Sequence, residues 1–270
     1  MSVQVSNLSF GYPGQPEVLK DISFTIPEGI LVSLLGPNGA GKSTLMKCML
    51  GLMRHYRGDI VLDGVDIRNL TPKQMARKTA YIPQSAEGVF NYTVEEMVLM
   101  GTTSLLSGLN SPGKKEEETV LSALRKLHID HLRYRRYMNL SGGERQLVMI
   151  ARALAQNTRI LYMDEPAANL DYGNQIRVME EIRSLIREGY TVFQTTHNPD
   201  QAFLYSDRIM ALAEGKIIAY GTPQEVITPD LIRRLYHIET EIERLHDDRI
   251  RICIPASVLE GVKTDEQRVN

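Results

Sequence analysis

The sequence predicts an α/β fold: a parallel-sheet core with an antiparallel β subdomain and an inserted all-helical subdomain. Three observations predict it. An apolar strand, Ile30–Leu35, runs directly into a glycine-rich loop that opens a helix. Strand, helix and strand follow one another over Arg159–Met163, Asn174–Glu188 and Thr191–Thr196, an order that favours parallel pairing. From about residue 87 to residue 157 the strand signals disappear, which indicates a helical insertion.

The composition is that of an ordinary globular protein. The 270 residues are 43% hydrophobic and 24% charged, and the formal net charge is −2. This charge gives no electrostatic case for binding nucleic acid or an anionic membrane surface. No apolar run approaches the length of a membrane span. The start, MSVQVSNLSF, lacks a basic region and an apolar signal core, so we expect no secretion. Cys48 and Cys253 lie far apart and in no metal-binding spacing, so we expect reduced thiols in a cytosolic protein.

The first third of the chain is predicted to be a β-rich layer that leads into the phosphate-binding loop. Residues 21–26 alternate polar and apolar side chains, as a half-buried strand does. Residues 60–67 carry the dipeptide Asp63-Gly64, which favours a hairpin turn. The loop opens a helix that we expect to cover Lys42–Leu52.

Later elements are predicted from helix-start signals, turns and apolar runs. Thr71 with Gln74, and Thr93 with Glu96, have the spacing of helix-starting capping boxes. The other predicted elements are a strand over Thr79–Ile82, a helix over Glu116–His128, a strand over Arg208–Ala211 in a hairpin that turns at Glu214-Gly215, a helical tail from Pro223, and a further strand over Arg249–Ile254.

These elements divide the chain into a core with one insertion. We expect residues 1–86 and 158–240 to form the core with its β subdomain. Residues 87–157 would form the helical subdomain, and residues 241–270 a C-terminal tail. A chain of this length is large enough for such an arrangement.

Residues 36–43, GPNGAGKS, match the pattern GxxxxGK[ST] in full and stand between a strand and a helix, which is the context that its chemistry requires. The glycines let the backbone wrap a phosphate with its amides pointing inward, and Lys42 would neutralise the β- and γ-phosphates. The Ser43 hydroxyl would bind Mg²⁺. A glycine turn alone does not explain Lys42-Ser43, so the sequence predicts the core of a P-loop NTPase. The predicted nucleotide contacts are Gly36, Pro37, Asn38, Gly39, Ala40, Gly41, Lys42, Ser43 and Thr44.

A strand that ends in two carboxylates is predicted to complete the metal site. Residues 159–165, RILYMDE, place Asp164 at the end of an apolar strand, where it would hold Mg²⁺ through water. Glu165, the next residue, is the predicted general base for an attacking water. Adjacent residues of a strand point to opposite faces, which suits two carboxylates with different roles.

Two polar residues at strand ends are further candidates. His197 follows the strand Thr191–Thr196, and Gln84 follows the strand Thr79–Ile82. The carboxyl ends of parallel strands border the ligand crevice of such a sheet. A lone histidine is more often structural than catalytic, so only its place in this series favours His197. Gln84 is a candidate contact to Mg²⁺ or to water.

Residues 140–146, LSGGERQ, predict a second helix start that could bind phosphate. Ser141 can cap the helix and Glu144 can close a capping box. Gly142 and Gly143 leave bare amides at the positive end of that helix. No lysine stands beside them. The segment is therefore either a plain capped helix or half of a site whose ligand is held elsewhere.

The motifs resemble, in identity and order, those of the nucleotide-binding subunit of an ATP-binding cassette (ABC) transporter. They are Gly36–Thr44, Gln84, Leu140–Gln146, Ile160–Pro166, Leu170-Asp171 and His197, and the resemblance covers roughly Val3 to Ile238. It implies ATP and Mg²⁺ as ligands and ATP hydrolysis as the activity. It also implies that Glu165 is the catalytic base and that His197 contacts the γ-phosphate.

The same resemblance implies a second copy of the chain as a partner. The LSGGE segment would cap the ATP held by that copy, so that two copies sandwich two ATP molecules head to tail. The residues implied to act in trans are Ser141, Gly142, Gly143, Glu144 and Asp171. Tyr12, in FGYPG, matches the aromatic residue that stacks on adenine, although a turn tyrosine fits the sequence equally well. The chain departs from the family pattern at Ala167-Ala168-Asn169, which bears on the dimer interface.

Shorter segments resemble the importer ATPases of iron-siderophore, haem and cobalamin uptake. They are VLMG at 98–101, LNSPGKK at 109–115, ARALAQ at 151–156 and GTPQEV at 221–226. This resemblance implies integral-membrane permease subunits, docked in a groove near Gln84–Met100, and a substrate-binding protein that acts through the permease. It implies a peripheral protein on the cytoplasmic face of the inner membrane.

The alternative function is a soluble ABC ATPase that acts on nucleic acid or as an assembly scaffold. Residues 133–137, RYRRY, interleave arginine and tyrosine, a pattern that can grip phosphate and stack bases. The net charge of −2, the single cassette and the lack of a long coiled-coil insertion stand against it. We therefore expect no nucleic-acid partner.

Overall fold

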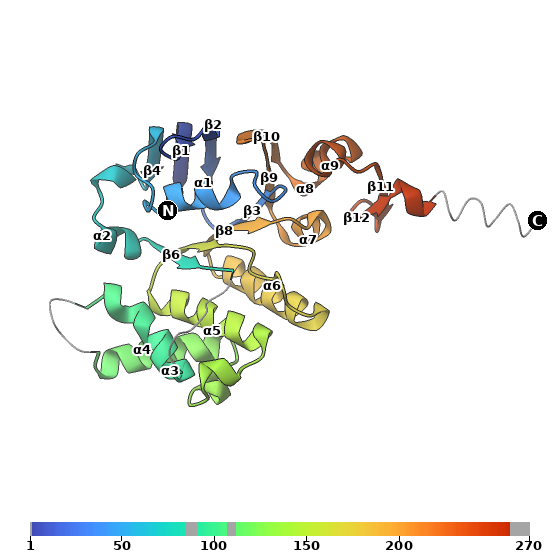
Figure 1. Ribbon diagram of the computed structural model, residues 1–270. Coiled ribbons are helices and arrows are strands. Elements are labelled where there is room, and N and C mark those ends of the chain that lie inside the picture. The colour runs from blue at the N-terminus through green and yellow to red at the C-terminus, as the bar shows by residue number, and fades with distance from the viewer. Residues whose placement is uncertain (1, 85–90, 107–111, 260–270) are drawn as a thin grey trace, which may run out of the picture.

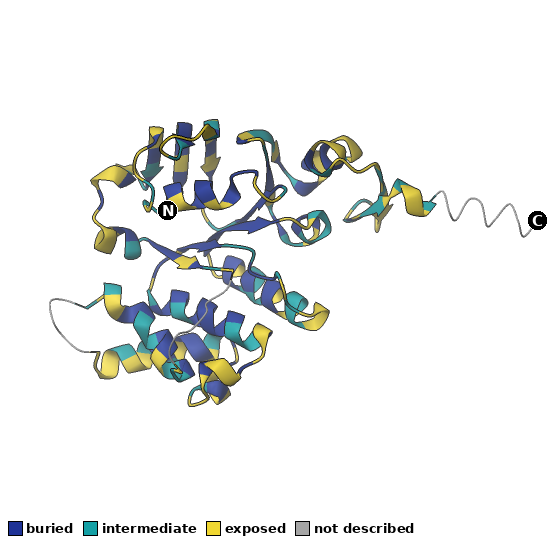
Figure 2. Ribbon diagram, viewed as in Figure 1, coloured by how far each residue is buried: buried dark blue, intermediate teal, exposed yellow. Residues whose placement is uncertain are grey.

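The computed structural model describes residues 2–84, 91–106 and 112–259. Figure 1 shows a central sheet with antiparallel strands and helix α1 (Lys42–Met49) above it and a group of helices below it. The described C-terminal segment extends to one side. Figure 2 shows that buried residues concentrate in the central sheet and on the helix faces turned toward it.

A six-stranded sheet forms the core, with the strand order β10-β9-β3-β8-β7-β6. Its strands are β3 (Leu31–Leu35), β6 (Thr79–Ile82), β7 (Ile160–Met163), β8 (Thr191–Thr196), β9 (Arg208–Ala213) and β10 (Lys216–Gly221). All neighbours pair in parallel except β9 and β10, which form the predicted hairpin. Strands β3, β7 and β8 are buried along their whole length, as parallel strands covered on both faces are. The predicted parallel-sheet core is confirmed.

The register of the sheet brings three distant chain segments to one edge. Leu35 pairs with Thr196, and Met163 pairs with Gln194. The residues that follow β3, β7 and β8 therefore leave the sheet side by side, at the edge where α/β proteins bind ligands.

An antiparallel sheet with the order β2-β1-β4-β5 forms the β subdomain. Its strands are β1 (Val3–Gly11), β2 (Glu17–Ile26), β4 (Arg57–Leu62) and β5 (Val65–Asp66). The predicted hairpin turn is confirmed, because Asp63 and Gly64 have φ values of 51° and 76°, as a type I′ turn requires. One buried cluster joins these strands to α1 and to the core sheet. The short η1 (Ile67–Asn69) and α2 (Pro72–Ala76), which starts at the predicted Thr71 capping box, follow β5.

Helix α1 is shorter than predicted. It ends at Met49 and not at Leu52, because Gly51 takes a positive φ of 68° and donates its amide to the carbonyl oxygen of Cys48 at 2.9 Å. Glycine in this conformation ends helices.

The described residues between β6 and β7 form helices and no strand. They are α3 (Val94–Leu99), η2 (Met100–Ser104), α4 (Lys114–Lys126), η3 (Asp130–Leu132), η4 (Tyr137–Asn139) and α5 (Gly142–Ala155). The predicted Thr93 capping box starts α3. One buried cluster joins these helices to α6 (Tyr172–Arg187) and the core sheet. The domain boundary predicted at residues 86 and 87 lies outside the described residues, as do residues 85–90 of the predicted groove.

The C-terminal part packs against the sheet at β9. Helices α7 (Pro199–Tyr205), α8 (Pro223–Val226) and α9 (Pro229–Tyr236) share a buried cluster with that strand. The predicted strand over Arg249–Ile254 is confirmed as β12 (Ile250–Pro255), which pairs with β11 (Thr240–Leu245). Arg251 anchors this hairpin by donating to the carbonyl oxygens of Gln224 and Ile227 at 2.7 and 2.9 Å.

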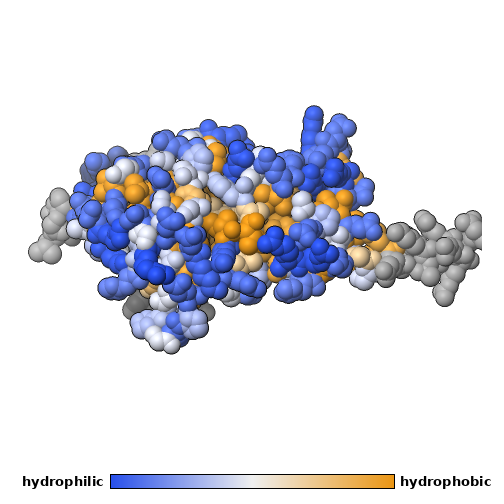
Figure 3. All heavy atoms as spheres, turned by 90° about the horizontal axis from the view of Figure 1, so that it is seen from above, coloured by the Kyte–Doolittle hydropathy of each residue, from blue (hydrophilic) through white to orange (hydrophobic). Residues whose placement is uncertain are grey.

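The surface seen from above is mostly hydrophilic, with apolar side chains gathered in a band across its middle (Figure 3). Within residues 2–84, 91–106 and 112–259, no helix combines the length and the apolar character needed to span a membrane.

We expect Gly101→Ala to lower the free energy of unfolding by about 1–3 kcal/mol. The added Cβ would lie 2.1 Å from the carbonyl oxygen of Arg152, which forces η2 away from α5. Gly173→Ala is the matched control, because its Cβ would meet only Asp171 Oδ1 at 3.7 Å and alanine suits a helix better than glycine. Chemical denaturation compares the two variants. Equal stabilities would contradict the close approach of η2 to α5.

Candidate functional site

The phosphate-binding loop joins β3 to α1 in a backbone path that requires glycine. A Cβ on Gly36 would lie 2.4 Å from the carbonyl oxygen of Leu212, and Gly39 and Gly41 have φ values of 81° and 108°. Gly41 also forms the N-cap of α1, whose first turn holds no acidic residue. The positive end of α1 is therefore left for an anion.

Lys42 is buried at the start of α1, with an exposed fraction of only 6%. Its Nζ donates to the carbonyl oxygens of Gly36 and Pro37 at 2.6 and 3.2 Å. It also lies 3.6 Å from Glu165 Oε1. Burial lowers the pKa of Lys42, and the carboxylates of Glu165 and Asp164 oppose that shift. These carboxylates therefore help to keep the ammonium charged where phosphate would bind.

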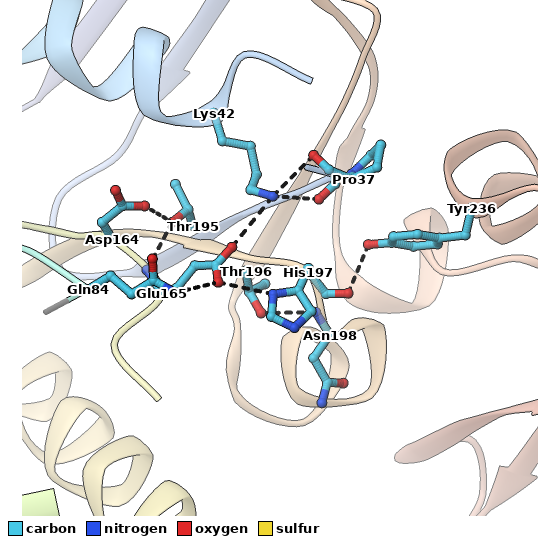
Figure 4. A network of polar contacts seen from close by, with 11 residues as sticks. Pro37, Lys42, Gln84, Asp164, Glu165, Thr195, Thr196, His197, Asn198 and Tyr236 are labelled. Carbon is cyan, nitrogen blue, oxygen red and sulfur yellow. Dashed lines mark hydrogen bonds and ion pairs between the residues drawn. The ribbon is translucent and has the colours of Figure 1, made fainter. Parts of the chain in front are cut away.

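Asp164 and Glu165 follow β7 and turn in different directions (Figure 4). Glu165 has a positive φ of 45°, which is uncommon for a residue with a side chain. Thr195, on the neighbouring β8, holds both residues: its Oγ1 donates to Asp164 Oδ1 at 2.6 Å and accepts from the Glu165 amide at 2.9 Å. Burial and the nearby Asp164 carboxylate raise the pKa of Tyr81 to about 12.

The Glu165 carboxylate is the centre of the polar network in Figure 4. Its side chain is 12% exposed, and its Oε2 lies 3.3 Å from Gln84 Nε2 and 3.1 Å from His197 Nδ1. The network therefore joins four predicted site residues that come from α1, from the ends of β7 and β8, and from the segment after β6. These residues lie up to 155 positions apart in the sequence, from Lys42 to His197.

A cavity of about 540 Å³ lies over this network, a size that suits a small-molecule ligand. The predicted residues that line it are Pro37, Asn38, Gly39, Gly41, Lys42, Ser43, Thr44, Gln84, Asp164, Glu165 and His197. Gly36 and Ala40, also predicted as contacts, do not line it.

The donor set of this cavity fits Mg²⁺. Ser43, Gln84 and Asp164 offer a hydroxyl, an amide and a carboxylate oxygen around one space. Hard oxygen ligands with a single carboxylate suit an ion that shares its coordination with substrate phosphates and water. The described residues hold no group of three or more His, Cys, Asp and Glu side chains able to cage a metal by themselves.

Tyr12 lies beside the loop but does not line the cavity. Its hydroxyl is 3.4 Å from Thr44 Oγ1, and its ring packs edge-on against Phe10 with centroids 5.1 Å apart. Its carbonyl oxygen accepts the amide of Gln15 at 2.9 Å. These contacts belong to a turn tyrosine next to the site, and its stacking on adenine stays a prediction.

The LSGGE segment lies apart from the cavity, whose described lining includes none of residues 140–146. Ser141 caps α5, and the capping box with Glu144 is closed in both directions. The hydrogen bond from the Ser141 amide lowers the pKa of Glu144. The charged Glu144 carboxylate is therefore part of the helix cap. Among the described residues, no partner accepts from the amides of Gly142 and Gly143.

Asn174 joins this segment to Asp171. A Cβ on Gly143 would lie 2.2 Å from Asn174 Oδ1. Asp171 caps α6 and accepts from the Asn174 backbone amide and side chain at 2.9 and 2.7 Å. The residues predicted to act in trans thus lie near one another, and none of them is among the residues that line the cavity.

Several residues of the RYRRY segment make contacts within the chain. Arg133 pairs with Glu95, Arg136 donates to the carbonyl oxygen of Asn91, and Tyr137 is buried. Tyr134 alone of the two tyrosines is exposed, with the Arg133 guanidinium over its ring. These contacts do not support the nucleic-acid alternative.

Five residues contribute to the site that the sequence did not predict for it. Thr195 holds both carboxylates, and Val18, Ala168, Asn169 and Gln175 line the cavity. The position of Thr195 near the end of a buried strand was a usable signal, because a buried hydroxyl needs a partner. Gln175 sits on a helix face, and nothing in its local sequence marks it.

Residues 19–168 match the family model described as ABC transporter. The ferric enterobactin transport ATP-binding protein FepC of Escherichia coli is 38% identical over 236 residues, which is 87% of each chain. The hemin import ATP-binding protein HmuV of Bordetella pertussis is 38% identical over 251 residues, which is 90% of this chain and 94% of that protein.

A solved structure described as an inward-facing conformation of a metal-chelate type ABC transporter contains a similar chain. The two chains superpose with a TM-score of 0.84 and 27% identity, over 96% of this chain and 98% of the other. The family match covers more than half of the sequence, and both relatives align with most of it. The chain therefore belongs to the ABC transporter family, as an ATP-binding subunit that hydrolyses ATP.

Proposed function

We propose that the chain powers an importer for iron-siderophore, haem or cobalamin-type substrates. Three similarities support this class: one relative transports ferric enterobactin, another imports hemin, and the similar solved structure is of the metal-chelate type. The transported compound would bind to other subunits. The part of the work assigned to this chain is to bind and hydrolyse ATP.

The position of Glu165 is the observation that carries the hydrolytic mechanism. Its carboxylate lies in the cavity between Lys42 Nζ at 3.6 Å and His197 Nδ1 at 3.1 Å. Lys42 and the loop amides would bind the β- and γ-phosphates of ATP. Glu165 would accept a proton from the water that attacks the γ-phosphorus, and His197 would contact the γ-phosphate.

Ser43, Gln84 and Asp164 are the proposed ligands of Mg²⁺. When bound, the ion neutralises phosphate charge. Thr195 positions the Asp164 carboxylate for this task through the bond of 2.6 Å. The Gln84 amide nitrogen already faces Glu165, which leaves its oxygen available to the ion.

A second copy of the chain is the proposed source of the missing half of the ATP site. The amides of Gly142 and Gly143 stand at the positive end of α5, where they attract phosphate. Gly143 and Asp171 both contact Asn174, and Ser141 caps the helix that holds Gly143, so these residues form one unit. Because this unit does not line the cavity of its own chain, a head-to-tail pair of chains would use it to close the partner's ATP site.

The membrane partners follow from the proposed class. Permease subunits would dock on the chain, and a substrate-binding protein would act through the permease. The chain would then be peripheral, on the cytoplasmic face of the inner membrane. Co-purification from membranes, followed by transport assays with iron chelates, haem and corrinoids, tests this. A nucleic-acid or assembly-complex partner in place of a permease would contradict it.

We expect Glu165→Gln to keep ATP binding and to reduce turnover by at least about 100-fold, because only the proton acceptor is lost. Steady-state hydrolysis and equilibrium ATP binding measure the two properties separately. Asp164→Asn serves as the contrast, since it should weaken Mg²⁺-dependent ATP binding itself. A Glu165→Gln chain that hydrolyses ATP at the normal rate would remove Glu165 from this role.

We expect Ser141→Arg to abolish hydrolysis without weakening ATP binding to the monomer, because Ser141 acts on the partner's nucleotide. Thr71→Arg is the matched control: Thr71 is also exposed and also closes a capping box, so both changes remove a cap worth about 1 kcal/mol. Only Ser141→Arg should stop hydrolysis. Loss of ATP binding by the Ser141→Arg monomer would show that this segment serves its own chain.

A further inference from the structure

Tyr236 touches the site from a part of the chain that carries none of the nucleotide motifs. It is the last residue of α9 and lies beyond the family match, which ends at residue 168. Its hydroxyl donates a hydrogen bond to the carbonyl oxygen of His197 at 3.0 Å. Figure 4 shows this contact on the side of His197 away from Lys42.

The His197 ring has little packing to hold it. Its side chain is 56% exposed, and its Nδ1 lies 3.1 Å from Glu165 Oε2. The direction of an exposed ring depends largely on the backbone that carries it. That backbone is the turn between β8 and α7, where the Asn198 amide donates to Thr196 Oγ1 at 3.1 Å.

The helix that bears Tyr236 is firmly anchored. Leu231 and Leu235 of α9 are buried in the cluster with β9. Burial, and then the charge of Glu165, raise the pKa of Tyr236, so its hydroxyl stays a proton donor at neutral pH. A second bond ties the same region to the tail, because Asp200 Oδ1, in the first turn of α7, accepts the Cys253 amide at 2.9 Å.

We infer that Tyr236 is a positioning residue, whose hydroxyl fixes the backbone of His197 so that the imidazole stays beside Glu165. This inference rests on the proposed roles of His197 and Glu165 in hydrolysis. It gives the C-terminal segment a part in catalysis that the nucleotide motifs do not assign to it. The competing explanation is that the bond only anchors the end of α9.

The test is Tyr236→Phe in the full-length chain, which removes the hydroxyl and keeps the ring. We expect kcat for ATP hydrolysis to fall by about threefold to tenfold, the effect of one lost hydrogen bond. KM for ATP should change by less than about twofold, because the phosphate loop binds the nucleotide. The thermal unfolding midpoint should fall by no more than about 2–4 °C, the effect of one lost hydrogen bond.

Tyr220→Phe is the matched control. The Tyr220 hydroxyl also donates to a backbone carbonyl oxygen, that of Thr25 at 2.7 Å, but it joins β10 to β2 and not to the site. This variant should keep the kcat of the unsubstituted chain. The comparison separates a loss at His197 from the loss of any tyrosine hydrogen bond.

Three outcomes would overturn the inference. They are an unchanged kcat in Tyr236→Phe, an equal loss in Tyr220→Phe, or a fall in kcat with an unfolding midpoint well below that of Tyr220→Phe. Glu165→Gln is measured alongside. If it is inactive while Tyr236→Phe has normal activity, only the positioning role fails. If the unsubstituted chain itself does not hydrolyse ATP, the proposed function fails instead.

Discussion

The register of three parallel strands is the constraint on which the site depends. Strands β3, β7 and β8 end at the same edge of the sheet, since Leu35 pairs with Thr196 and Met163 with Gln194. The phosphate loop, the carboxylate pair and His197 each begin one residue later in the chain. A shift of one residue in the pairing would move every side chain of the shifted strand to the opposite face and separate Glu165 from Lys42. The buried apolar strands therefore fix the geometry of the polar network.

The network in turn compensates for unfavourable local states. Glu165 adopts a left-handed backbone conformation that costs about 1 kcal/mol or more, and its amide is satisfied by Thr195. Lys42 is buried, which lowers its pKa, and the carboxylates of Glu165 and Asp164 oppose this shift. Strain and charge are thus concentrated where a phosphate and an attacking water would meet, which is where such features are expected to have a function.

Much of this arrangement could be predicted from the sequence because its signals are local. The GPNGAGKS loop, the Asp63-Gly64 turn and the capping boxes each depend on a few adjacent residues, and the structure has the expected strands, turns and helix starts at these places. The contributions of Thr195, Gln175 and Tyr236 could not be predicted in this way, because each depends on pairing between segments far apart in the sequence. The early end of α1 had a local signal in Gly51 that the apolar run Leu50–Leu52 obscured.

The two helix starts that the sequence predicts to bind phosphate lie in different surroundings. The start of α1 lines the cavity, whereas the described lining contains no residue of the start of α5, and Asn174 holds the latter in a unit with Asp171. A site completed by a second copy accounts for both. The most direct measurement is ATP hydrolysis by an equal mixture of Lys42→Ala and Ser141→Arg chains, each inactive alone. Composite sites predict recovery to about a quarter of the normal rate, because half of the dimers are mixed and each mixed dimer holds one intact site. A mixture as inactive as its components would contradict the account.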